Sequence, residues 1–223
     1  VGRFARFVEA FDVWRAAGHP SAGAAEHTFI PGTGWQSDWP LPETREELER
    51  KIVSCPFVTT YALRDGNLTL PMNCVSWYEA FAFCAWDGKR LLTEAEWELV
   101  AKAGSEDRLY PWGNEEPTPD LAVFACNGLG LPSPHCEAGD VLPVGSKPLG
   151  FSKHGLSDMT GSVGEWVFDK PADTVTDPCV DCAATESERM PTQRVFRGGG
   201  YSSAGMMLQT EIRSTSETIG TPD

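Results

Sequence analysis

Three consecutive glycines, at positions 198–200, directly follow an apolar pair formed by Val195 and Phe196. β-Branched and aromatic residues that run into glycines are typical of a short buried strand, which ends where the backbone passes close to another group. The polar residues that come next, 201–203, would lie at that close approach. A glycine triplet is also common in simple tight turns, so the choice between the two interpretations depends on the rest of the chain.

A polar cleft after the glycines is the first candidate for chemistry. Its six residues would be Tyr201, Ser202, Ser203, Gln209, Glu211 and Arg213. Ser203 has no evident base partner in the sequence. The four histidines stand singly, at His19, His27, His135 and His154, without a His-x-x-Glu motif or an i, i+4 pair. Neither catalytic zinc nor a facial iron triad therefore has a visible ligand set, and we expect the histidines to be solvated loop residues.

Seven cysteines are many for a chain of 223 residues in a reducing compartment. Their spacing favours three disulfides with one cysteine left over: the predicted pairs are Cys55–Cys74, Cys126–Cys136 and Cys179–Cys182, and the remaining residue is Cys84. The alternatives are a zinc site, which needs four converging ligands, and a redox Cys-x-x-Cys at 179–182, which would open a helix. Structural bridges fit this loop-like segment better, and they predict an oxidising, extracytoplasmic location.

The charge balance excludes some partners. With 18 Lys and Arg against 32 Asp and Glu the net charge is −14, whereas nucleic acids and anionic membrane surfaces are bound through basic patches. No apolar run approaches the roughly 18 residues of a transmembrane helix, so we expect no membrane insertion. The hydrophobic content of 41% can bury one core. We predict a single domain over residues 1–223, and because Val1 is not an initiator we expect the sequence to be cut at its N-terminus.

Two capping boxes predict the helices that would support the cleft. The pairs are Ser76 with Glu79 and Thr93 with Glu96. The first helix is apolar on nearly every side, so we expect it to be buried almost all round and to stop at Gly88. The second carries one apolar stripe and should end at Gly104.

A third capping box, at Thr44, predicts a short charged helix at the surface that ends at about Ile52. Three stretches rich in Gly, Pro or polar residues predict irregular loops, at 18–43, 114–154 and 170–193.

Five segments occur in an order that is typical of one protein family: Cys74-Val-Ser-Trp-Tyr-Glu-Ala, Gly88-Lys-Arg-Leu-Leu-Thr-Glu-Ala-Glu-Trp97, Tyr110-Pro-Trp-Gly113, Gly155-Leu-Ser-Asp-Met-Thr-Gly-Ser-Val-Gly-Glu-Trp166 and Arg197-Gly-Gly-Gly-Tyr201. Together they resemble the signatures of the formylglycine-generating enzyme (sulfatase-modifying factor) family. The resemblance implies an α+β fold, a variant of the C-type lectin fold with two main helices, few short strands and much irregular loop. It also implies that the sequence is truncated at its C-terminus as well, because members of the family continue beyond the position of Asp223 and carry there a cysteine that would pair with Cys84.

The activity of that family is the aerobic conversion of a substrate cysteine to formylglycine, with a copper ion held by two cysteine thiolates. Soft thiolates suit Cu(I). The resemblance places the two ligand positions at Ser203 and Leu208. A serine hydroxyl is not a soft anionic ligand and leucine has no donor atom, so the sequence argues against copper and against formylglycine generation.

Calcium is the metal that the resemblance favours instead. Relatives bind it with oxygen ligands at two segments, which correspond to residues 125–128 and 161–166. The candidate ligands are Asn127, Gly128, Asp140, Ser162 and Glu165. Ser162 and Gly164 depart from the family pattern, in which an amide ligand and an aromatic residue stand there. A hard cation needs six to eight oxygens, which loop carbonyls would complete; the alternative is that Asn127 and Gly128 only form a turn.

Two classes of function remain open. The first, which we favour, is a secreted, periplasmic or envelope-anchored domain without formylglycine-generating activity. It would act as a binding or accessory module for a protein, peptide or glycan through loops 18–43, 114–140 and 170–193. The second is a metal-dependent oxidase or oxygenase of the same superfamily with altered chemistry. Stoichiometric copper or iron in the purified protein would favour the second class.

Overall fold

The computed structural model describes residues 1–55, 59–127, 136–172 and 179–217. Four α-helices and three short strands follow one another along these residues: α1 (Gly2–Ala16), α2 (Arg45–Val53), α3 (Trp77–Trp86), α4 (Glu94–Ala101), β1 (Glu165–Trp166), β2 (Gln193–Arg197) and β3 (Arg213–Glu217). Four short 3-10 helices lie between them, at Gly104–Glu106, Ala138–Asp140, Pro148–Gly150 and Gly205–Leu208. The described part is thus a mixed α/β fold with much irregular loop, as expected, and it contains the helices predicted after the capping residues Thr44, Ser76 and Thr93.

The apolar face of α1 packs against α3. Phe4, Phe7 and Phe11 recur at helical spacing and are all buried. The ring centroid of Phe7 lies 5.4 Å from that of Phe11 and 5.9 Å from that of Phe83 on α3, both in edge-on geometry. Such aromatic pairs contribute about 0.5–1.5 kcal/mol each beyond the buried area. This aromatic layer joins the N-terminal helix to the core.

The helix α2 differs from its prediction in two respects. Thr44 caps it by accepting the backbone N–H of Glu47 at 3.2 Å, but the Glu47 carboxylate accepts the N–H of Glu43 rather than that of Thr44, so the capping box is only half formed. Leu48 and Ile52 are fully buried in the same apolar cluster as the α1 phenylalanines. An apolar pair at i, i+4 is enough to seat a helix on the core even when its other faces are charged.

Both other capping boxes are formed. The N–H of Ser76 donates to the Glu79 carboxylate at 2.8 Å, and the N–H of Thr93 donates to that of Glu96 at 2.9 Å. No residue of α3 is exposed: four of its ten residues are buried and six are half-buried, so the helix is covered on nearly every side, as its composition predicts. The starts of α3 and α4 are therefore fixed by local interactions.

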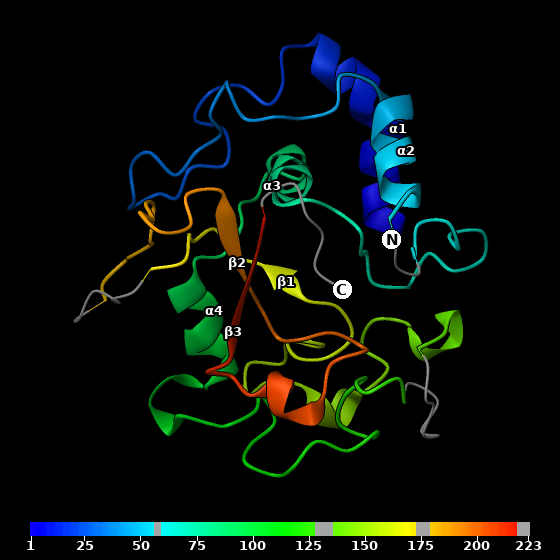
Figure 1. Ribbon diagram of the computed structural model, residues 1–223, viewed down its shortest axis with the longest axis vertical. Helices are drawn as coiled ribbons and strands as arrows, with labels where there is room; N and C mark the ends of the chain where they lie inside the picture. The colour runs from blue at the N-terminus through cyan, green and yellow to red at the C-terminus, as the bar shows by residue number, and fades with distance from the viewer. Residues whose placement is uncertain (56–58, 128–135, 173–178, 218–223) are drawn as a thin grey trace.

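Two tryptophans attach these helices to the strands. The indole N–H of Trp77 donates to the backbone oxygen of Val167 at 2.8 Å. Trp97 and Ala101 on α4 are buried against Val167 and Val195, with Met159 in the same cluster. Helix α4 thereby lies beside the sheet, as Figure 1 shows.

The three strands form one antiparallel sheet in the order β1-β2-β3. Its register places Glu165 opposite Arg197, and Arg197 opposite Arg213. In Figure 1, α1 and α2 lie at one end of the molecule and the 3-10 helix Gly205–Leu208 lies at the other. The row of three charged residues across the sheet lies between these ends, next to α4.

The three predicted disulfides are present, at Cys55–Cys74, Cys126–Cys136 and Cys179–Cys182. Cys84 is the free cysteine among the described residues. Within the same ranges, every helix is too short or too polar to span a bilayer.

Candidate functional site

The backbone after β2 makes the close approach that its glycines predict. Gly198 has a φ of +90°, and a Cβ atom at this position would lie 2.5 Å from the backbone oxygen of Met159. The N–H of Gly161 donates to the oxygen of Gly198 at 2.8 Å. A side chain at 198 would therefore clash with backbone, which is why the strand ends in glycine here.

Three loop segments are hydrogen-bonded together around this point. The N–H of Tyr201 donates to Ser162 at 2.8 Å, and the oxygen of Tyr201 accepts the N–H of Cys126 at 2.8 Å. The oxygen of Ser203 accepts the N–H of Ala125 at 2.9 Å. The segments 123–127, 159–162 and 198–203 thus form one hydrogen-bonded unit, the glycine junction. Cys126 in its first segment is disulfide-bonded to Cys136.

The two positions expected for copper ligands do not fit a copper ion. The hydroxyl oxygen of Ser203 accepts the N–H of Gly200 at 2.9 Å. Leu208 is fully buried, in an apolar cluster with Tyr110 and Ala122. One position therefore offers a neutral, hydrogen-bonded hydroxyl and the other a hydrocarbon surface, where a soft metal would need two thiolates.

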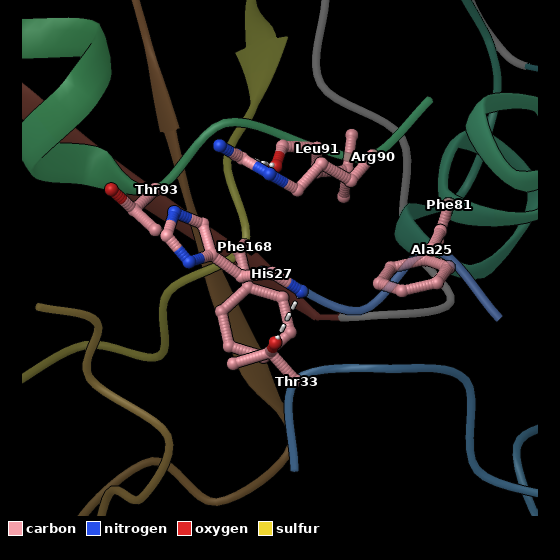
Figure 2. Close-up of a pocket in the computed structure, with 8 residues that line it drawn as sticks. All are labelled: Ala25, His27, Thr33, Phe81, Arg90, Leu91, Thr93 and Phe168. Carbon is pink, nitrogen blue, oxygen red and sulfur yellow. Dashed lines mark hydrogen bonds between the residues drawn. The ribbon is translucent and has the colours of Figure 1, made fainter. Parts of the chain in front are cut away.

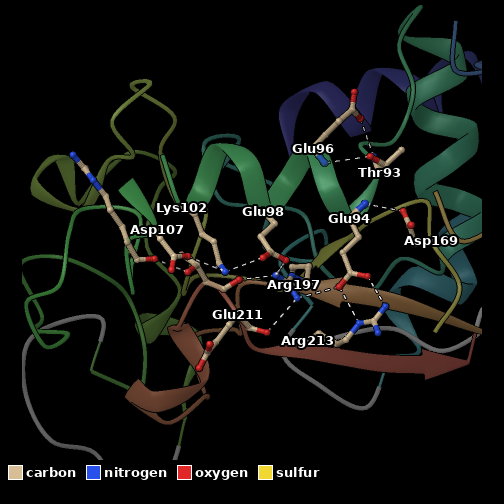
Figure 3. A network of polar contacts seen from close by, with 12 residues as sticks. Thr93, Glu94, Glu96, Glu98, Lys102, Asp107, Asp169, Arg197, Glu211 and Arg213 are labelled. Carbon is tan, nitrogen blue, oxygen red and sulfur yellow. Dashed lines mark hydrogen bonds and ion pairs between the residues drawn. The ribbon is translucent and has the colours of Figure 1, made fainter. Parts of the chain in front are cut away.

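The six residues of the predicted cleft do not share one environment. Tyr201 is buried in an apolar cluster with Val123, whereas Ser202 and Glu211 are exposed. Arg213 is occupied by Glu94, and Figure 3 shows the carboxylate of Glu211 pointing away from Arg213. The six residues line neither the small cavity beside His27 nor the larger groove between α1 and the turn at residues 61–69. The polar cleft stays a prediction.

A buried ion network that the sequence did not predict joins α4 to the sheet (Figure 3). The guanidinium of Arg197 is almost completely buried, 5.0 Å above the Trp97 ring. It lies 3.0 Å from a carboxylate oxygen of Glu94 and 3.1 Å from one of Glu98. The same Glu94 carboxylate accepts the Nε–H of Arg213 at 2.9 Å. Two guanidiniums on adjacent strands thus share one carboxylate on the first turn of α4.

Asp169 connects this network to the loop before β2. Its two carboxylate oxygens accept the N–H groups of Glu94 and Ala184, each at 2.7 Å. Burial raises the pKa of Asp169 to about 6, although the two backbone N–H groups lower it. Burial also lowers the pKa of the Arg197 guanidinium, against the opposite effect of Glu94 and Glu98. The network is a structural support, because every charged group in it already has a partner.

Two carboxylates near the glycine junction have no such partner. Glu165 accepts the indole N–H of Trp97 at 2.6 Å, and Asp158 accepts the N–H of Gly145 at 2.6 Å. Neither carboxylate forms an ion pair within the described residues. Burial raises the pKa of Glu165 to about 7, and the charge of Asp158 acts in the same direction. Burial also raises the pKa of Asp158.

This carboxylate pair has the donor chemistry of a hard-cation site. Asp158 has a φ of +56° and belongs to the loop that approaches Gly198. The buried hydroxyl of Thr160, two residues later, has no hydrogen-bond partner. A divalent cation would neutralise the two carboxylates and could be coordinated by the hydroxyl oxygen of Thr160. The oxygen donors of these residues are of the kind that calcium prefers. Only Glu165 was predicted as a ligand, and Asp158 was visible in the sequence solely as part of the Gly155–Trp166 segment.

The other predicted calcium ligands have local roles. The side-chain oxygen of Asn127 accepts the N–H of Phe124 at 3.3 Å, and the carboxylate of Asp140 accepts the N–H of Glu137 at 2.9 Å. Ser162 is buried and its backbone oxygen binds Tyr201. Gly128 lies outside the described residues. No group of three or more His, Cys, Asp and Glu side chains converges within those residues, so any cation site needs backbone or hydroxyl oxygens as well.

One histidine is not solvated, contrary to its prediction. His27 is buried; its Nε2 lies 3.4 Å from Glu96, and its Nδ1 accepts the N–H of Phe29 at 3.1 Å. Figure 2 shows the imidazole beside a small cavity of about 10 Å³, with Thr93 and Phe168 next to it. Both ring nitrogens are engaged and the cavity has room for about one water molecule. His27 is therefore a core residue and no general base. His135 lies outside the described residues.

Known proteins resemble this chain over most of its length. The family model described as the sulfatase-modifying factor enzyme 1-like domain matches residues 2–222. Inactive C-alpha-formylglycine-generating enzyme 2 of Mus musculus is 32% identical over 166 residues, covering 70% of this chain and 46% of that protein. Formylglycine-generating enzyme of Streptomyces coelicolor is 38% identical over 141 residues, covering 61% of this chain and 43% of that protein. The chain thus spans less than half the length of these two relatives.

Among solved structures, that of PvdO from Pseudomonas aeruginosa superposes with a TM-score of 0.55. The sequences are 24% identical, and the match covers 69% of this chain and 59% of that one. At this identity the similarity concerns the fold alone.

Proposed function

Because the chain belongs to the sulfatase-modifying factor enzyme 1-like family, we propose that it is a member that does not generate formylglycine and that serves as a binding or accessory module. The family includes both active enzymes and proteins whose names describe them as inactive. Membership of the family alone therefore does not decide whether this chain is active. The answer depends on its own residues at the two copper-ligand positions.

The environment of Leu208 is the observation that supports the proposal most strongly. A lost ligand could be replaced by another donor nearby, but Leu208 is fully buried against Tyr110 and Ala122. Its surroundings are those of an apolar core, and the hydroxyl of Ser203 is engaged by the backbone of Gly200. Neither position offers the charge or polarisability that Cu(I) requires.

Metal analysis separates this proposal from an altered oxidase or oxygenase. The purified protein, dialysed against EDTA and then reconstituted separately with Cu(I) and Fe(II), should retain neither metal at one ion per chain after desalting. Stoichiometric copper or iron that resists desalting would contradict the binding-module proposal and favour the second class of function.

The disulfides support an oxidising location for the module. The three bridges join Cys55 to Cys74, Cys126 to Cys136 and Cys179 to Cys182, and all six cysteines lie outside the α-helices and strands. Disulfides persist in secreted and envelope-facing proteins and are rare in reducing compartments. We propose that the irregular loops that they hold present the binding face.

We also propose that the module binds calcium at Asp158 and Glu165, with Thr160 and loop carbonyls as further oxygen donors. The cation would supply charge neutralisation and hold the junction of segments 123–127, 159–162 and 198–203 in one arrangement. Asn127, Asp140 and Ser162, which the sequence analysis predicts as calcium ligands, stay proposed ligands in the loops that adjoin this site. Calcium suits such irregular loops better than magnesium, which demands a tighter octahedral arrangement.

A further inference from the structure

A groove with a volume of about 460 Å³ lies between α1, the start of α2 and the turn at residues 61–69. Figure 1 shows α1 and α2 side by side at this end of the molecule. None of the residues of the glycine junction lines the groove. Its volume is within the range of about 300–1,000 Å³ that is typical of small-molecule sites.

The walls of the groove are held in place without a ligand. The N–H of Gly2 donates to the oxygen of Leu68 at 2.9 Å, and the N–H of Val144 donates to the oxygen of Thr69 at 2.9 Å. The hydroxyl of Tyr61 donates to Glu49 on α2 at 2.9 Å. The turn is thus tied to α1, to α2 and to a distant loop, so a ligand would meet a preformed surface.

The cationic side of the groove is a guanidinium with unused donors. Arg64 lies 4.4 Å above the ring of Tyr61, and one of its NH2 groups donates to the Tyr61 backbone oxygen at 3.1 Å. It forms no ion pair with any described residue. Arg45, on the same groove, lies 3.4 Å from Glu49, whose carboxylate also accepts the Tyr61 hydroxyl. Arg64 therefore presents the forked geometry that binds a carboxylate.

The opposite charge lines the same groove and is also unpaired. Glu9 on α1 and Asp65 in the turn both face it, are exposed, and form no ion pair within the described residues. All separations between these carboxylates and Arg64 consequently exceed the 4.0 Å of an ion pair. Groups of both charges therefore line one groove without neutralising each other, and a ligand that carries both charges would match this arrangement.

We propose that this groove binds a short zwitterionic peptide, with the ligand carboxylate on Arg64 and the ligand ammonium on Glu9. Apolar surface from Ala5 and Leu68, which also line the groove, would contact the ligand side chains. The inference goes beyond the proposed absence of oxidase chemistry and does not depend on it, because the groove and the glycine junction share no residue.

Three forms of one peptide test the charge requirement. The probes are trialanine, N-acetyl-trialanine and trialanine amide, titrated into the whole protein by calorimetry at low ionic strength. Trialanine should bind, and each capped form should bind about tenfold more weakly or worse, a factor that corresponds to 1.4 kcal/mol. Equal binding by the acetylated peptide would overturn the proposal in favour of a simple anion site, and no binding of trialanine at millimolar concentration would refute it outright.

Two neutral substitutions locate the site. Arg64→Gln should weaken trialanine binding about tenfold, while leaving the weak binding of trialanine amide unchanged. Glu9→Gln should also weaken trialanine binding about tenfold, while leaving the weak binding of N-acetyl-trialanine unchanged. Arg6→Gln on the exposed side of α1 is the matched control and should bind as the unmodified protein does. Unchanged trialanine affinity in both groove variants, with unaltered unfolding midpoints, would contradict the assignment.

Discussion

The indole N–H of Trp97 donates a 2.6 Å hydrogen bond to the carboxylate of Glu165. A neutral donor, rather than a cation, thus holds this half-buried carboxylate beside the glycine junction. Burial raises the pKa of this carboxyl to about 7. At neutral pH this carboxyl group can therefore either keep its proton or lose it and bind a cation. The first two predictions below depend on this equilibrium.

The first prediction concerns pH. A carboxyl whose folded-state pKa lies above its unfolded value contributes stability that is complete below pH 4.5 and is lost as the pH rises through about 7. The loss amounts to at most about 3.4 kcal/mol, at 1.36 kcal/mol per pKa unit between 4.5 and about 7. In EDTA, the unfolding free energy of the unmodified protein should therefore fall from pH 5 to pH 8 more steeply than that of Glu165→Gln. Urea titrations measure both slopes.

The control for this prediction is Glu188→Gln, which removes an exposed carboxylate. This variant should follow the pH dependence of the unmodified protein. Asp169, with a pKa raised to about 6 by burial, contributes a fall of the same sign in both proteins and cancels in the comparison. Identical slopes for the unmodified protein and Glu165→Gln would show that the Glu165 carboxylate is not desolvated.

The second prediction concerns calcium. A cation that binds the folded state alone, at a hundredfold excess over its Kd, stabilises it by about 2.7 kcal/mol. For a domain of this size each kcal/mol raises the unfolding midpoint by about 2–4 °C, so calcium should raise it by roughly 5–10 °C over EDTA. Magnesium should have a smaller effect. Scanning calorimetry at pH 7.5 is the measurement.

Two isosteric variants locate this cation. Glu165→Gln and Asp158→Asn should each abolish most of the calcium shift, and Glu165→Gln should also raise the midpoint in EDTA because it removes a buried charge while keeping the Trp97 hydrogen bond. Asn127→Ala is the comparison for the adjoining loop, and it should lower the EDTA midpoint because the Phe124 N–H loses its acceptor. A midpoint within a degree in calcium and EDTA would rule out the proposed site.

The third prediction concerns the cysteines. Non-reducing digestion should yield three linked peptide pairs, and Cys84 alone should be alkylated. Burial raises the pKa of the Cys84 thiol to about 11, so this alkylation at pH 8 should require denaturant. Alkylation of Cys179 and Cys182 in air-equilibrated native protein would instead point to a dithiol or a metal site.

The bridge between Cys55 and Cys74 should matter most for stability. This bridge closes the longest of the three loops, because its two cysteines are 19 positions apart in the sequence. In the chain-entropy account a loop of this size contributes about 3 kcal/mol. Replacing both cysteines with serine should therefore lower the unfolding free energy by more than the same change at Cys179 and Cys182. Equal losses for the two double variants would contradict this account.

The fourth prediction concerns the close approach at the glycines. Gly198→Ala places a Cβ 2.5 Å from the oxygen of Met159, whereas at Gly199 the nearest atom is 3.1 Å away. Both residues have positive φ, which costs an alanine about 1–2 kcal/mol. Gly198→Ala should therefore lower the unfolding free energy by clearly more than Gly199→Ala, as urea titration would measure. Equal losses would mean that backbone conformation alone, and not the contact, selects glycine at 198.

The parts of the fold that the sequence predicts best are those with short-range causes. The capping boxes of α3 and α4 depend on pairs three residues apart, and both were predicted and are confirmed. The glycines after β2 also signalled a close approach correctly. The disulfide pairs followed from spacing in an oxidised protein.

What could not be predicted depends on contacts between distant segments. Asp158 and Glu165 become a candidate cation site because Trp97 and Gly145 bury and orient them, and nothing local in the sequence encodes that burial. His27 lies 69 positions from its partner Glu96, so its isolation in the sequence suggested solvent exposure wrongly.

The most direct test of the central claim is an oxidation assay on a substrate peptide that contains Cys-x-Pro-x-Arg. The protein is supplied with Cu(I), oxygen and a thiol reductant, and mass spectrometry follows the conversion of the peptide cysteine to an aldehyde. Because Ser203 is held by Gly200 and Leu208 is buried in apolar surroundings, we predict no conversion above a control without protein. Conversion at several turnovers per chain would contradict the account.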